Sequence, residues 1–360
     1  MTPGGPASPT GAAVPAPRAE AAVPAALALL SSVGISDAHL AAVLADGLLQ
    51  VEQRLSAAVS TTDRLAAATT RHLLQAGGKR TRPLLCLLAA QLGDPTPAVV
   101  DAAVVVELTH LATLYHDDVM DSADVRRGVP AAHAVWGNTV AILSGDLLFA
   151  RASRVCAGLG PEAVIIQSET FERLCLGQLH ETDGPAPGED GVDHYLQVLA
   201  DKTGSLIATA CMFGGMFAGA DQATCDVLRA YGERVGVAFQ LADDIIDLTS
   251  ESVASGKTPG IDLREGVATL PVLVARAMVA AGEGGTSGDR LVELLAAGLA
   301  TDADLAEAIA ILRVHPAMAL ARAAAREAAD DAVAALDPLP PGPVRDALAA
   351  VAGALIERVT

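Results

Sequence analysis

The sequence contains few cations and few cysteines, and each shortage excludes a class of protein. Only 24 of its 360 residues are Lys or Arg, against 43 Asp and Glu. The chain therefore lacks the broad basic surface that binding to nucleic-acid phosphates requires. Its five cysteines form no Cys-x-x-Cys pair, and their odd number argues against a disulfide framework. A reducing cytoplasm is the compartment that this cysteine usage predicts.

Other absences concern the fold. Neither the apolar and polar alternation of β-strands nor a Gly-x-Gly-x-x-Gly loop occurs, which argues against a nucleotide-binding α/β fold. Aromatic residues make up only 2% of the chain, whereas hydrophobic residues, chiefly Ala, Leu and Val, make up 51%. Because polar, Gly-rich and Pro-rich breaks fall only between long helix-favouring segments, the sequence predicts an all-α fold.

Apolar residues recur with the helical period from Ala38 onward. After a first helix that begins there, the predicted helices cover residues 62–76, 80–92, 97–121, 137–158, 161–181, 192–219, 222–249, 268–282, 288–312, 316–335 and 343–359. Residues 1–34, rich in Pro, Ala and Gly, form a predicted disordered tail without the basic start of a signal peptide. Residues 35–360 are predicted to form one domain. The uncharged segment 204–220 contains four glycines and is short for a membrane span, so we expect a buried core helix and no transmembrane segment.

Two apolar segments each end in a cluster of aspartates. The clusters are Asp117, Asp118 and Asp121 in HDDVMD, and Asp243, Asp244 and Asp247 in DDIID. Residues three or four apart share a helix face, so carboxylates within a cluster lie about 5–6 Å apart. In a partly dehydrated cleft such a pair repels by roughly 3 kcal/mol. One cluster alone would most often be a solvated helix end, but the repeated pattern favours a site for Mg²⁺, which combines carboxylates with phosphate and water.

Cations stand beside glycines or beside these clusters at several places. They are Lys79, Arg80 and Arg82 in GGKRTRP, Arg126 and Arg127 after the first cluster, Lys202 with Thr203 ahead of an apolar helix, and Lys257 after the second cluster. Backbone N–H groups at a helix start can face the same anion as such side chains. Each cation by itself would be a surface charge, but together with the two aspartate clusters they predict a diphosphate site.

Five ordered motifs, GGKRTRP, HDDVMDSADVRRG, GDLLFARA, KTGSL and FQLADDIIDLTSESVASGKTPGIDLREGVATLP, resemble those of the trans-isoprenyl diphosphate synthases, also called polyprenyl synthetases. The resemblance extends from about residue 38 to the C-terminus. It implies a single-domain, all-α isoprenoid-synthase bundle around a deep central cavity, in a homodimer. It also implies a reaction in which an allylic diphosphate (dimethylallyl, geranyl, farnesyl or geranylgeranyl) ionises with Mg²⁺ assistance, isopentenyl diphosphate attacks it, and a proton is lost.

The resemblance assigns roles to individual residues. Asp117, Asp118 and Asp121 resemble ligands of two Mg²⁺ ions and Asp243, Asp244 and Asp247 those of a third. The residues similar to an isopentenyl diphosphate site are Lys79, Arg82, His110 and Arg127, and those similar to an allylic diphosphate site are Arg126, Lys202, Thr203, Gln240 and Lys257. A direct part in catalysis is expected for Asp117, Asp118, Asp121, Lys202, Asp243 and Lys257. Many relatives have a Lys in place of Val267, so the allylic site is expected to have one cation fewer.

Small residues precede the first aspartate cluster. Thr113 and Ala112 are the fourth and fifth residues before Asp117, and relatives with aromatic residues there make short products. The resemblance therefore implies a medium- or long-chain product, with quinone side chains as its expected use. A C20 product for terpenoid synthesis remains the alternative.

Three other classes fit the sequence less well. A class I terpene cyclase also uses DDxxD, but DDIID differs from its second metal motif, and GGKRTRP would have no role. An inactive subunit of a two-component synthase would have lost aspartates that are present here, and a purely structural helical scaffold would not require cations beside the acids.

Overall fold

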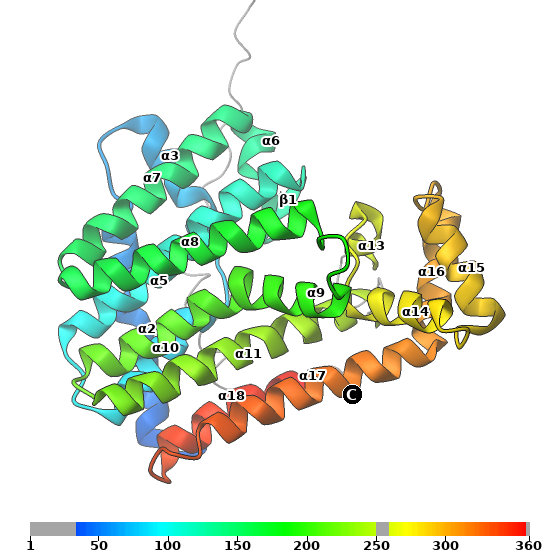
Figure 1. Cartoon of the computed structure of the whole chain (residues 1–360). Coiled ribbons are helices and arrows are strands. Elements are labelled where there is room, and N and C mark those ends of the chain that lie inside the picture. Colours follow the sequence, from blue (N-terminus) through cyan, green and yellow to red (C-terminus); the bar gives the residue numbers. More distant parts are fainter. Residues whose placement is uncertain (1–33, 250–258, 358–360) are drawn as a thin grey trace, which may run out of the picture.

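The structure, a computed structural model, describes residues 34–249 and 259–357, which form a helical assembly with one short hairpin (Figure 1). The helices are α2 (Ala38–Ala58), α3 (Arg64–Gln75), α4 (Thr81–Ala89), η2 (Ala90–Leu92), α5 (Pro97–Met120), α6 (Ala132–Trp136), α7 (Asn138–Ala157), α8 (Pro161–Asp183), α9 (Gly191–Leu199), η3 (Ala200–Gly204), α10 (Ser205–Phe217), α11 (Gln222–Thr249), α13 (Ile261–Glu265), α14 (Leu270–Ala280), α15 (Gly285–Ala296), α16 (Asp302–Val314), α17 (Pro316–Ala335) and α18 (Pro343–Glu357). The all-α prediction is confirmed.

Local chemistry fixes many of the helix starts. The side chains of Asp37, Asp63 and Asp190 accept hydrogen bonds from backbone N–H groups in the first turns of α2, α3 and α9. Proline occupies the first turn of α5, α8, α14 and α17. The backbone N–H that proline lacks would have no partner within the helix at that position. These signals are readable in the sequence, and they explain why most predicted helix ranges agree with the structure to within a few residues.

One predicted range is interrupted by a turn in the structure, and another is preceded by a short helix that was not predicted. The range 288–312 contains α15 and α16, because the chain turns at Gly298 and Leu299, which have φ angles of 74° and 47°. A capping box between Thr301 and Asp304 then restarts the helix. The range 137–158 is preceded by the separate short helix α6, which ends at Gly137 with φ 83°.

A two-stranded hairpin follows the first aspartate cluster and was not predicted. Strand β1 (Val125–Arg126) pairs antiparallel with β2 (Val129–Pro130), and Arg127 and Gly128 between them both have positive φ angles, of 54° and 76°. Strands of two residues carry no alternation that a sequence pattern can show. This hairpin presents the two neighbouring arginines, Arg126 and Arg127.

The apolar core has two large clusters that continue into each other along α11 and α17. One contains the buried residues of α2 to α5, α7, α10 and α18 with the first half of α11, and the other those of α9 and α13 to α16 with the second half of α11. Figure 1 shows α11 and α17 lying side by side along the molecule, with α14 to α16 at one end.

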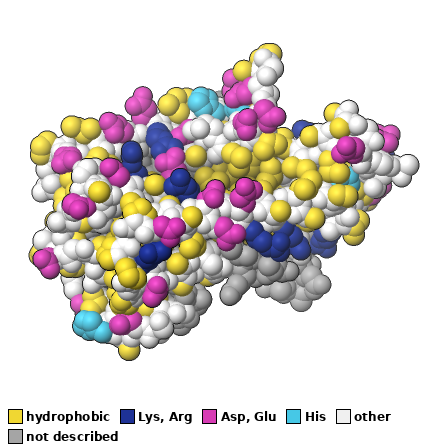
Figure 2. Space-filling model, turned by 60° about the horizontal axis from the view of Figure 1, so that its bottom comes forward, with side chains coloured by type: hydrophobic (Ala, Val, Ile, Leu, Met, Phe, Trp, Pro, Cys, Tyr) yellow, Lys and Arg dark blue, Asp and Glu magenta, His cyan; other side chains and the backbone are white. Residues whose placement is uncertain are grey.

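Helix α5 is central to the larger cluster. Among the described residues it alone is, as a single helix, long and apolar enough to cross a membrane, but 67% of its most apolar window is buried inside the protein. The bent pair α16 and α17 passes the same test jointly. The apolar stretch of α5 thus serves as core, with its polar end at the site described below. On the face shown in Figure 2, acidic side chains are widely spread, whereas Lys and Arg occur in small groups.

Candidate active site

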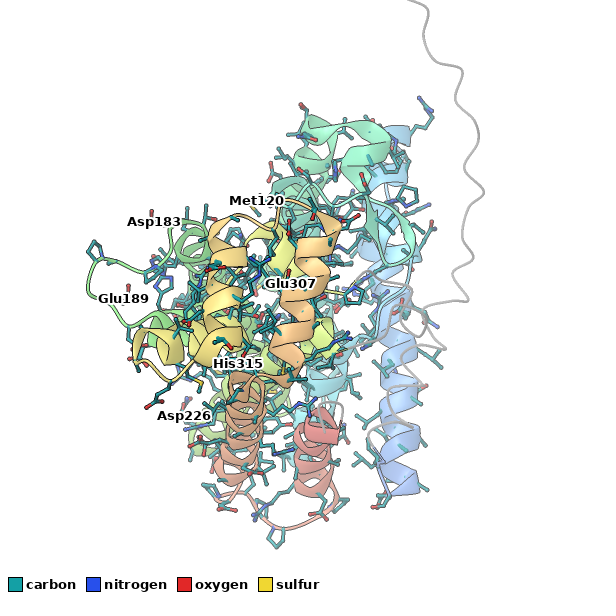
Figure 3. All side chains as sticks on the ribbon, turned by 90° about the vertical axis from the view of Figure 1, so that its right-hand side faces the viewer. Met120, Asp183, Glu189, Asp226, Glu307 and His315 are labelled. Atoms are coloured by element: carbon teal, nitrogen blue, oxygen red, sulfur yellow. The ribbon has the colours of Figure 1, made fainter. Side chains whose placement is uncertain are left out.

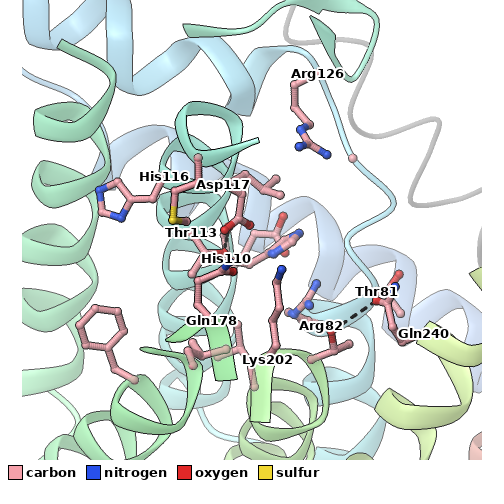
Figure 4. Close-up of a pocket in the computed structure, with 18 of the residues that line it drawn as sticks. Thr81, Arg82, His110, Thr113, His116, Asp117, Arg126, Gln178, Lys202 and Gln240 are labelled. Atoms are coloured by element: carbon pink, nitrogen blue, oxygen red, sulfur yellow. Dashed lines mark hydrogen bonds between the residues drawn. The ribbon is translucent and has the colours of Figure 1, made fainter. Parts of the chain in front are cut away.

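A cavity of about 930 Å³ lies between α5, α7, α8, α10 and α11. Its polar end is near the last turns of α5 and α8, whose final residues Met120 and Asp183 lie toward the same end of the bundle (Figure 3). Eleven of the predicted site residues line it: Lys79, Arg82, His110, Thr113, Asp117, Arg126, Arg127, Lys202, Thr203, Gln240 and Asp243. Figure 4 shows Asp117, His110, Arg82 and Lys202 directed toward one space. Residues from segments far apart in the sequence thus converge here.

The three aspartates of the first cluster have different surroundings. Asp117 lines the cavity, and its pKa is raised to about 6, chiefly by burial and further by Asp121, against the lowering effect of Lys202 and Arg126. Asp121 is exposed where α5 ends, and partial burial raises its pKa as well. Asp118 is fully buried, and its Oδ1 accepts a hydrogen bond from Arg126 Nε at 2.5 Å. Successive helical residues point about 100° apart, so Asp117 and Asp118 face different surroundings.

The second cluster shows the same division. Asp243 lines the cavity, whereas Asp244 is buried behind it and accepts hydrogen bonds from the Tyr195 hydroxyl and from Gln240 Nε2. Burial raises the pKa of Asp244 to about 6, although these two hydrogen bonds lower it. Asp247 is half-buried on the same helix, outside the cavity wall.

A further acid, Asp262 on α13, belongs to this neighbourhood. Its pKa is raised to about 7, first by burial and then by the nearby charges of Asp244 and Asp247. No role was predicted for Asp262, although the motif IDLREG is part of the family resemblance. The available signal was a carboxyl group in a short segment between two glycines, Gly260 and Gly266, that follows the second cluster.

The loop before α4 is locked in place by buried ion pairs. Arg80, with φ 52°, donates to Glu52 at 2.5 Å and to Glu107 at 3.0 Å, so its charge is compensated within the protein. This pairing explains a glutamate in the middle of apolar α5. Arg80 was grouped with Lys79 and Arg82 as an anion-facing cation, and the structure shows instead that it anchors the start of α4, between the loop residue Lys79 and the helix residue Arg82.

The same loop is joined to the hairpin. Arg127 Nη1 donates to the carbonyl oxygens of Leu73 and Gly77, and a Cβ atom at Gly78 would lie 2.8 Å from the Arg127 guanidinium carbon. Gly78 also has φ 147°. Glycine is the residue that allows both this backbone conformation and this close approach, which explains why a glycine stands at position 78 in GGKRTRP.

His110 sits among arginines. Its pKa is lowered well below 6.5, first by burial and then by the positive charges of Arg82, Arg127, Arg80 and Arg126, so the ring is neutral. Burial lowers the pKa of Arg82 to about 10, which leaves its guanidinium charged at neutral pH. Lys79 is exposed at the rim. A neutral ring surrounded by cations can donate a hydrogen bond to an anion without adding charge.

Lys202 is held by an acid that the sequence analysis missed. Its Nζ donates to Glu181 Oε2 on α8 at 2.5 Å. Burial lowers the pKa of Lys202, but Glu181, Asp117 and Asp121 raise it by more. Thr203 Oγ1 donates to Gln240 at 3.4 Å. Glu181 and the cavity-lining Gln178 occur in GQLHE, polar positions one helical turn apart near the end of α8.

The remaining wall is largely apolar. Leu174, Leu206 and Phe239 line it, together with Phe149 from α7 and Phe171 from α8, whose ring centroids are 4.2 Å apart. Thr113 lines it as predicted. Ala112 does not: it is fully buried in the core, where α7 approaches so closely that a Cβ on Gly145 would lie 3.1 Å from the Ala112 carbonyl oxygen. Of the two small residues predicted to face the growing chain, only Thr113 lies on the cavity wall.

Some predicted residues are not on the wall. Asp118, Asp121, Asp244 and Asp247 lie outside the cavity lining, and Lys257 lies outside the described residues. Val267 is half-buried after α13, and its N–H donates to the Asp262 carbonyl oxygen at 2.8 Å.

Comparisons with known proteins agree with this geometry. The family model described as polyprenyl synthetase matches residues 63–312. Nonaprenyl diphosphate synthase from Mycobacterium tuberculosis is 47% identical, over 92% of this chain and 98% of its own length. Among solved structures, decaprenyl diphosphate synthase from Rhodobacter capsulatus is 34% identical with a TM-score of 0.79, covering 89% of this chain and 99% of that one. Geranylgeranyl pyrophosphate synthase from Corynebacterium glutamicum, complexed with calcium and isoprenyl diphosphate, is 41% identical with a TM-score of 0.80, covering 90% and 98%.

Proposed function

Because the chain belongs to the polyprenyl synthetase family and is a prenyltransferase, we propose that its cavity joins isopentenyl diphosphate to an allylic diphosphate and releases a longer all-trans prenyl diphosphate. One observation carries the proposal. Asp117 from α5 and Asp243 from α11 line the same cavity as Arg82 and Lys202, while the rest of that cavity is lined by aliphatic and aromatic side chains. This combination suits a substrate with a diphosphate head and a hydrocarbon tail.

The polar end of the cavity suits the ionisation step. When the C–O bond of the allylic substrate breaks, the electron pair leaves with the diphosphate, and fixed cations such as Lys202 stabilise the charge that develops there. The double bond of isopentenyl diphosphate then attacks the allylic cation, and a proton is lost, with the released diphosphate as its acceptor. The apolar wall around Leu206 and Phe239 excludes water that would capture the cation.

We propose Mg²⁺ as the cofactor, with about three ions per site by resemblance to the family. The donor set fits a hard cation, because the side chains at issue are all carboxylates. Burial raises the pKa of Asp117 to about 6, and a cation bound beside this carboxylate would offset the cost of burying its charge. Within the described part of the chain, no three acids, histidines or cysteines are close enough to hold an ion alone. Substrate oxygens would complete the coordination of ions held by Asp117, Asp121 and Asp243. Bound there, the metal neutralises diphosphate charge.

The predicted diphosphate-binding residues divide into two groups, one for each substrate. We assign Lys79, Arg82, His110 and Arg127 to isopentenyl diphosphate, because His110 lies among the charges of the arginines and Lys79 precedes Arg82 at the same end of α4 by only three residues. We assign Arg126, Lys202, Thr203, Gln240 and Lys257 to the allylic diphosphate. Asp118 supports this second group by holding Arg126, and Asp244 does so by accepting a hydrogen bond from Gln240.

The size and lining of the cavity support a medium- or long-chain product. Its volume of about 930 Å³ is near the upper end of the range for small-molecule pockets, roughly 300–1,000 Å³. The Phe149 and Phe171 pair lies on the apolar wall, on helices other than α5, and we propose it as a determinant of chain length beside Thr113. Use in quinone side chains is the proposed destination. A C20 product is the second candidate, favoured by the likeness to the Corynebacterium structure.

We further propose a homodimer formed through α7 and α8. Large apolar side chains are exposed on these two helices: Ile142 by 42%, Leu143 by 60%, Ile165 by 58%, Leu176 by 41% and Leu179 by 63%. An apolar face of this extent favours coverage by a second subunit. Ile142 and Leu179 also line the cavity, so the partner would close its outer wall.

Residues 35–360 are proposed to act as one catalytic domain, supported by the continuity of the two core clusters along α11 and α17. A cytoplasmic location is proposed because all five cysteines are free thiols.

The function is tested by incubating the purified protein with Mg²⁺, labelled isopentenyl diphosphate and one allylic diphosphate at a time, from dimethylallyl to geranylgeranyl. We expect elongated diphosphates whose length is read by chromatography after dephosphorylation, and no product with a chelator present. A series that stops at C20 would select the alternative. A hydrocarbon formed from the allylic substrate alone would overturn the proposal in favour of a cyclase.

A further inference from the structure

The segment that carries Lys202 and Thr203 is a π-helical turn, η3, inserted between α9 and α10. Such turns contain an extra residue and occur frequently at functional sites. The side chains of this turn separate into two directions. Lys202 and Thr203 line the cavity, whereas Asp201 is buried outside the cavity wall and contacts α8.

Arg173 on α8 is the residue that Asp201 meets. Its Nε donates to Asp201 Oδ1 at 2.7 Å, and Gln197 holds the other oxygen of that carboxylate at 2.8 Å. Arg173 Nη2 also donates to Glu233 Oε1 on α11 at 2.8 Å and to the Ala200 carbonyl oxygen at 3.4 Å. One guanidinium therefore joins three elements, and it binds both the side chain and the backbone of the π-turn.

Three glycines bring the backbones together around this contact. A Cβ at Gly177 on α8 would lie 2.8 Å from Lys202 N, and one at Gly204 would lie 3.0 Å from the Glu233 carbonyl oxygen. A Cβ at Gly236 on α11 would lie 2.5 Å from Gly204 Cα. No side chain separates the π-turn from either neighbouring helix, so a shift at Arg173 is transmitted directly to Lys202.

We propose that Arg173 is a positioning residue for the diphosphate site: it fixes the π-turn so that Lys202 and Thr203 face the allylic diphosphate. Arg173 itself does not line the cavity and does not touch the substrate. The inference rests on the proposed function, because it assigns Lys202 and Thr203 to the allylic substrate.

The arrangement of charges predicts that Arg173 affects the allylic diphosphate site and not the isopentenyl diphosphate site. Arg173 lies between two acids, Asp201 and Glu233, on the outer side of the turn, and Lys202 is paired with Glu181 at the cavity. Removing the guanidinium leaves Asp201 without its cation, and the π-turn then loses the contacts that hold its side chain and its backbone to α8. The cations assigned to isopentenyl diphosphate are carried by other segments, namely the loop before α4, the first turn of α4 and the hairpin, and among the described residues Arg173 forms no hydrogen bond to any of them.

The test is Arg173→Gln, with separate Michaelis constants for the two substrates. We expect the KM for the allylic diphosphate to rise about tenfold, the effect of one displaced charge-assisted contact, and the KM for isopentenyl diphosphate to change less than about twofold. Arg173→Lys keeps one charged contact and should restore part of the allylic KM. Arg290→Gln is the matched control, since Arg290 also bridges two acids, Glu293 and Glu307, but on α15 and α16 away from the cavity.

The outcomes separate the inference from the function on which it rests. If the unmodified protein elongates allylic diphosphates while Arg173→Gln keeps its allylic KM, or raises both KM values equally, the positioning role is wrong and the function stands. If the unmodified protein does not elongate any allylic diphosphate, both are wrong. Should Arg173→Gln fail to fold, Asp201→Asn removes the same ion pair without changing side-chain size, and the same split between the two KM values is then required.

Discussion

Asp118 and Arg126 form a hydrogen-bonded ion pair, with Nε and Oδ1 2.5 Å apart and the carboxylate fully buried. The aspartate belongs to the first acidic cluster and the arginine to the hairpin that follows it, so the cluster orients one of its own neighbouring cations. Asp117, one residue earlier, faces the cavity instead. The two adjacent aspartates therefore differ in their surroundings: Asp117 lines the cavity, and Asp118 is held by a partner within the protein.

This difference predicts unequal effects of two otherwise identical substitutions. Asp117→Asn should lower kcat by about a hundredfold or more, because it removes a charge from the place proposed to bind the diphosphate and the metal. Asp118→Asn should act mainly through Arg126 and raise the KM for the allylic diphosphate by about tenfold, with a smaller loss of kcat. Steady-state kinetics with each substrate varied in turn checks both, and near-normal kcat in Asp117→Asn would remove that residue from the metal site.

The two small residues before Asp117 are predicted to respond differently to enlargement. Thr113→Phe places a ring in the cavity and should shorten the product without abolishing catalysis. Ala112→Phe overpacks the core against α7 and should destabilise the protein by about 1–3 kcal/mol instead. Product chromatography and thermal unfolding of both variants distinguish these effects. An unchanged chain length in Thr113→Phe would contradict this placement of the growing chain.

Removing a ring of the phenylalanine pair on the apolar wall should lengthen the product, whereas adding a ring at Thr113 should shorten it. Phe149→Ala opens space beside Phe171 and should lengthen the product by at least one isoprene unit, at a stability loss of about 3–5 kcal/mol. Phe217→Ala provides a control, because the ring of Phe217 also contacts that of a phenylalanine, Phe213, in an edge-to-face arrangement, but outside the cavity. It should lower stability without changing chain length. Equal product distributions in all three proteins would show that the pair does not limit elongation.

His110 predicts a pH dependence of stability. Its folded pKa is lowered well below the unfolded value of 6.5, so below that pH the unfolded chain binds a proton that the folded protein excludes. The stability associated with His110 is present above pH 6.5 and is lost as the pH falls. Between about pH 7.5 and 5.5, the free energy of unfolding should fall by about 1 kcal/mol more in the unmodified protein than in His110→Gln.

Chemical denaturation at the two pH values measures this difference. The carboxyl groups with raised pKa, such as Asp244 and Asp262, contribute equally to the pH dependence of both proteins, so their contributions cancel in the comparison. Parallel pH dependences would mean that His110 is not held neutral by its arginine neighbours.

The exposed apolar face of α7 and α8 predicts the assembly state. Leu143→Glu places a charge on this face and should convert a dimer into a monomer, as measured by sedimentation equilibrium. Leu320→Glu is the control, since Leu320 is similarly exposed but lies on α17. A monomeric unmodified protein, or a dimer unaffected by Leu143→Glu, would contradict the proposed interface.

Much of the fold was predictable because its signals are local. Proline and aspartate mark helix starts such as those of α5 and α9, and the turn at Gly298 and Leu299 was missed because alanine and leucine on both sides continue the helical pattern. The hairpin was missed because its strands contain only two residues each. Glu181 and Arg173 were missed because their partners, Lys202 and Asp201, are 21 and 28 residues away along the chain.

The sequence by itself determined the class of chemistry. Aspartates spaced three and four apart share a helix face, and their repetition beside Gly-flanked cations indicates a metal and diphosphate site, because both relations are set by the helical period. Only the tertiary structure decided which members of each motif face the cavity. Asp117 and Asp243 do so and Asp118 and Asp244 do not, Thr113 does so and Ala112 does not. The physical reason is that a helix fixes the angle between its own side chains, whereas the packing of remote helices fixes which of those directions is the cavity.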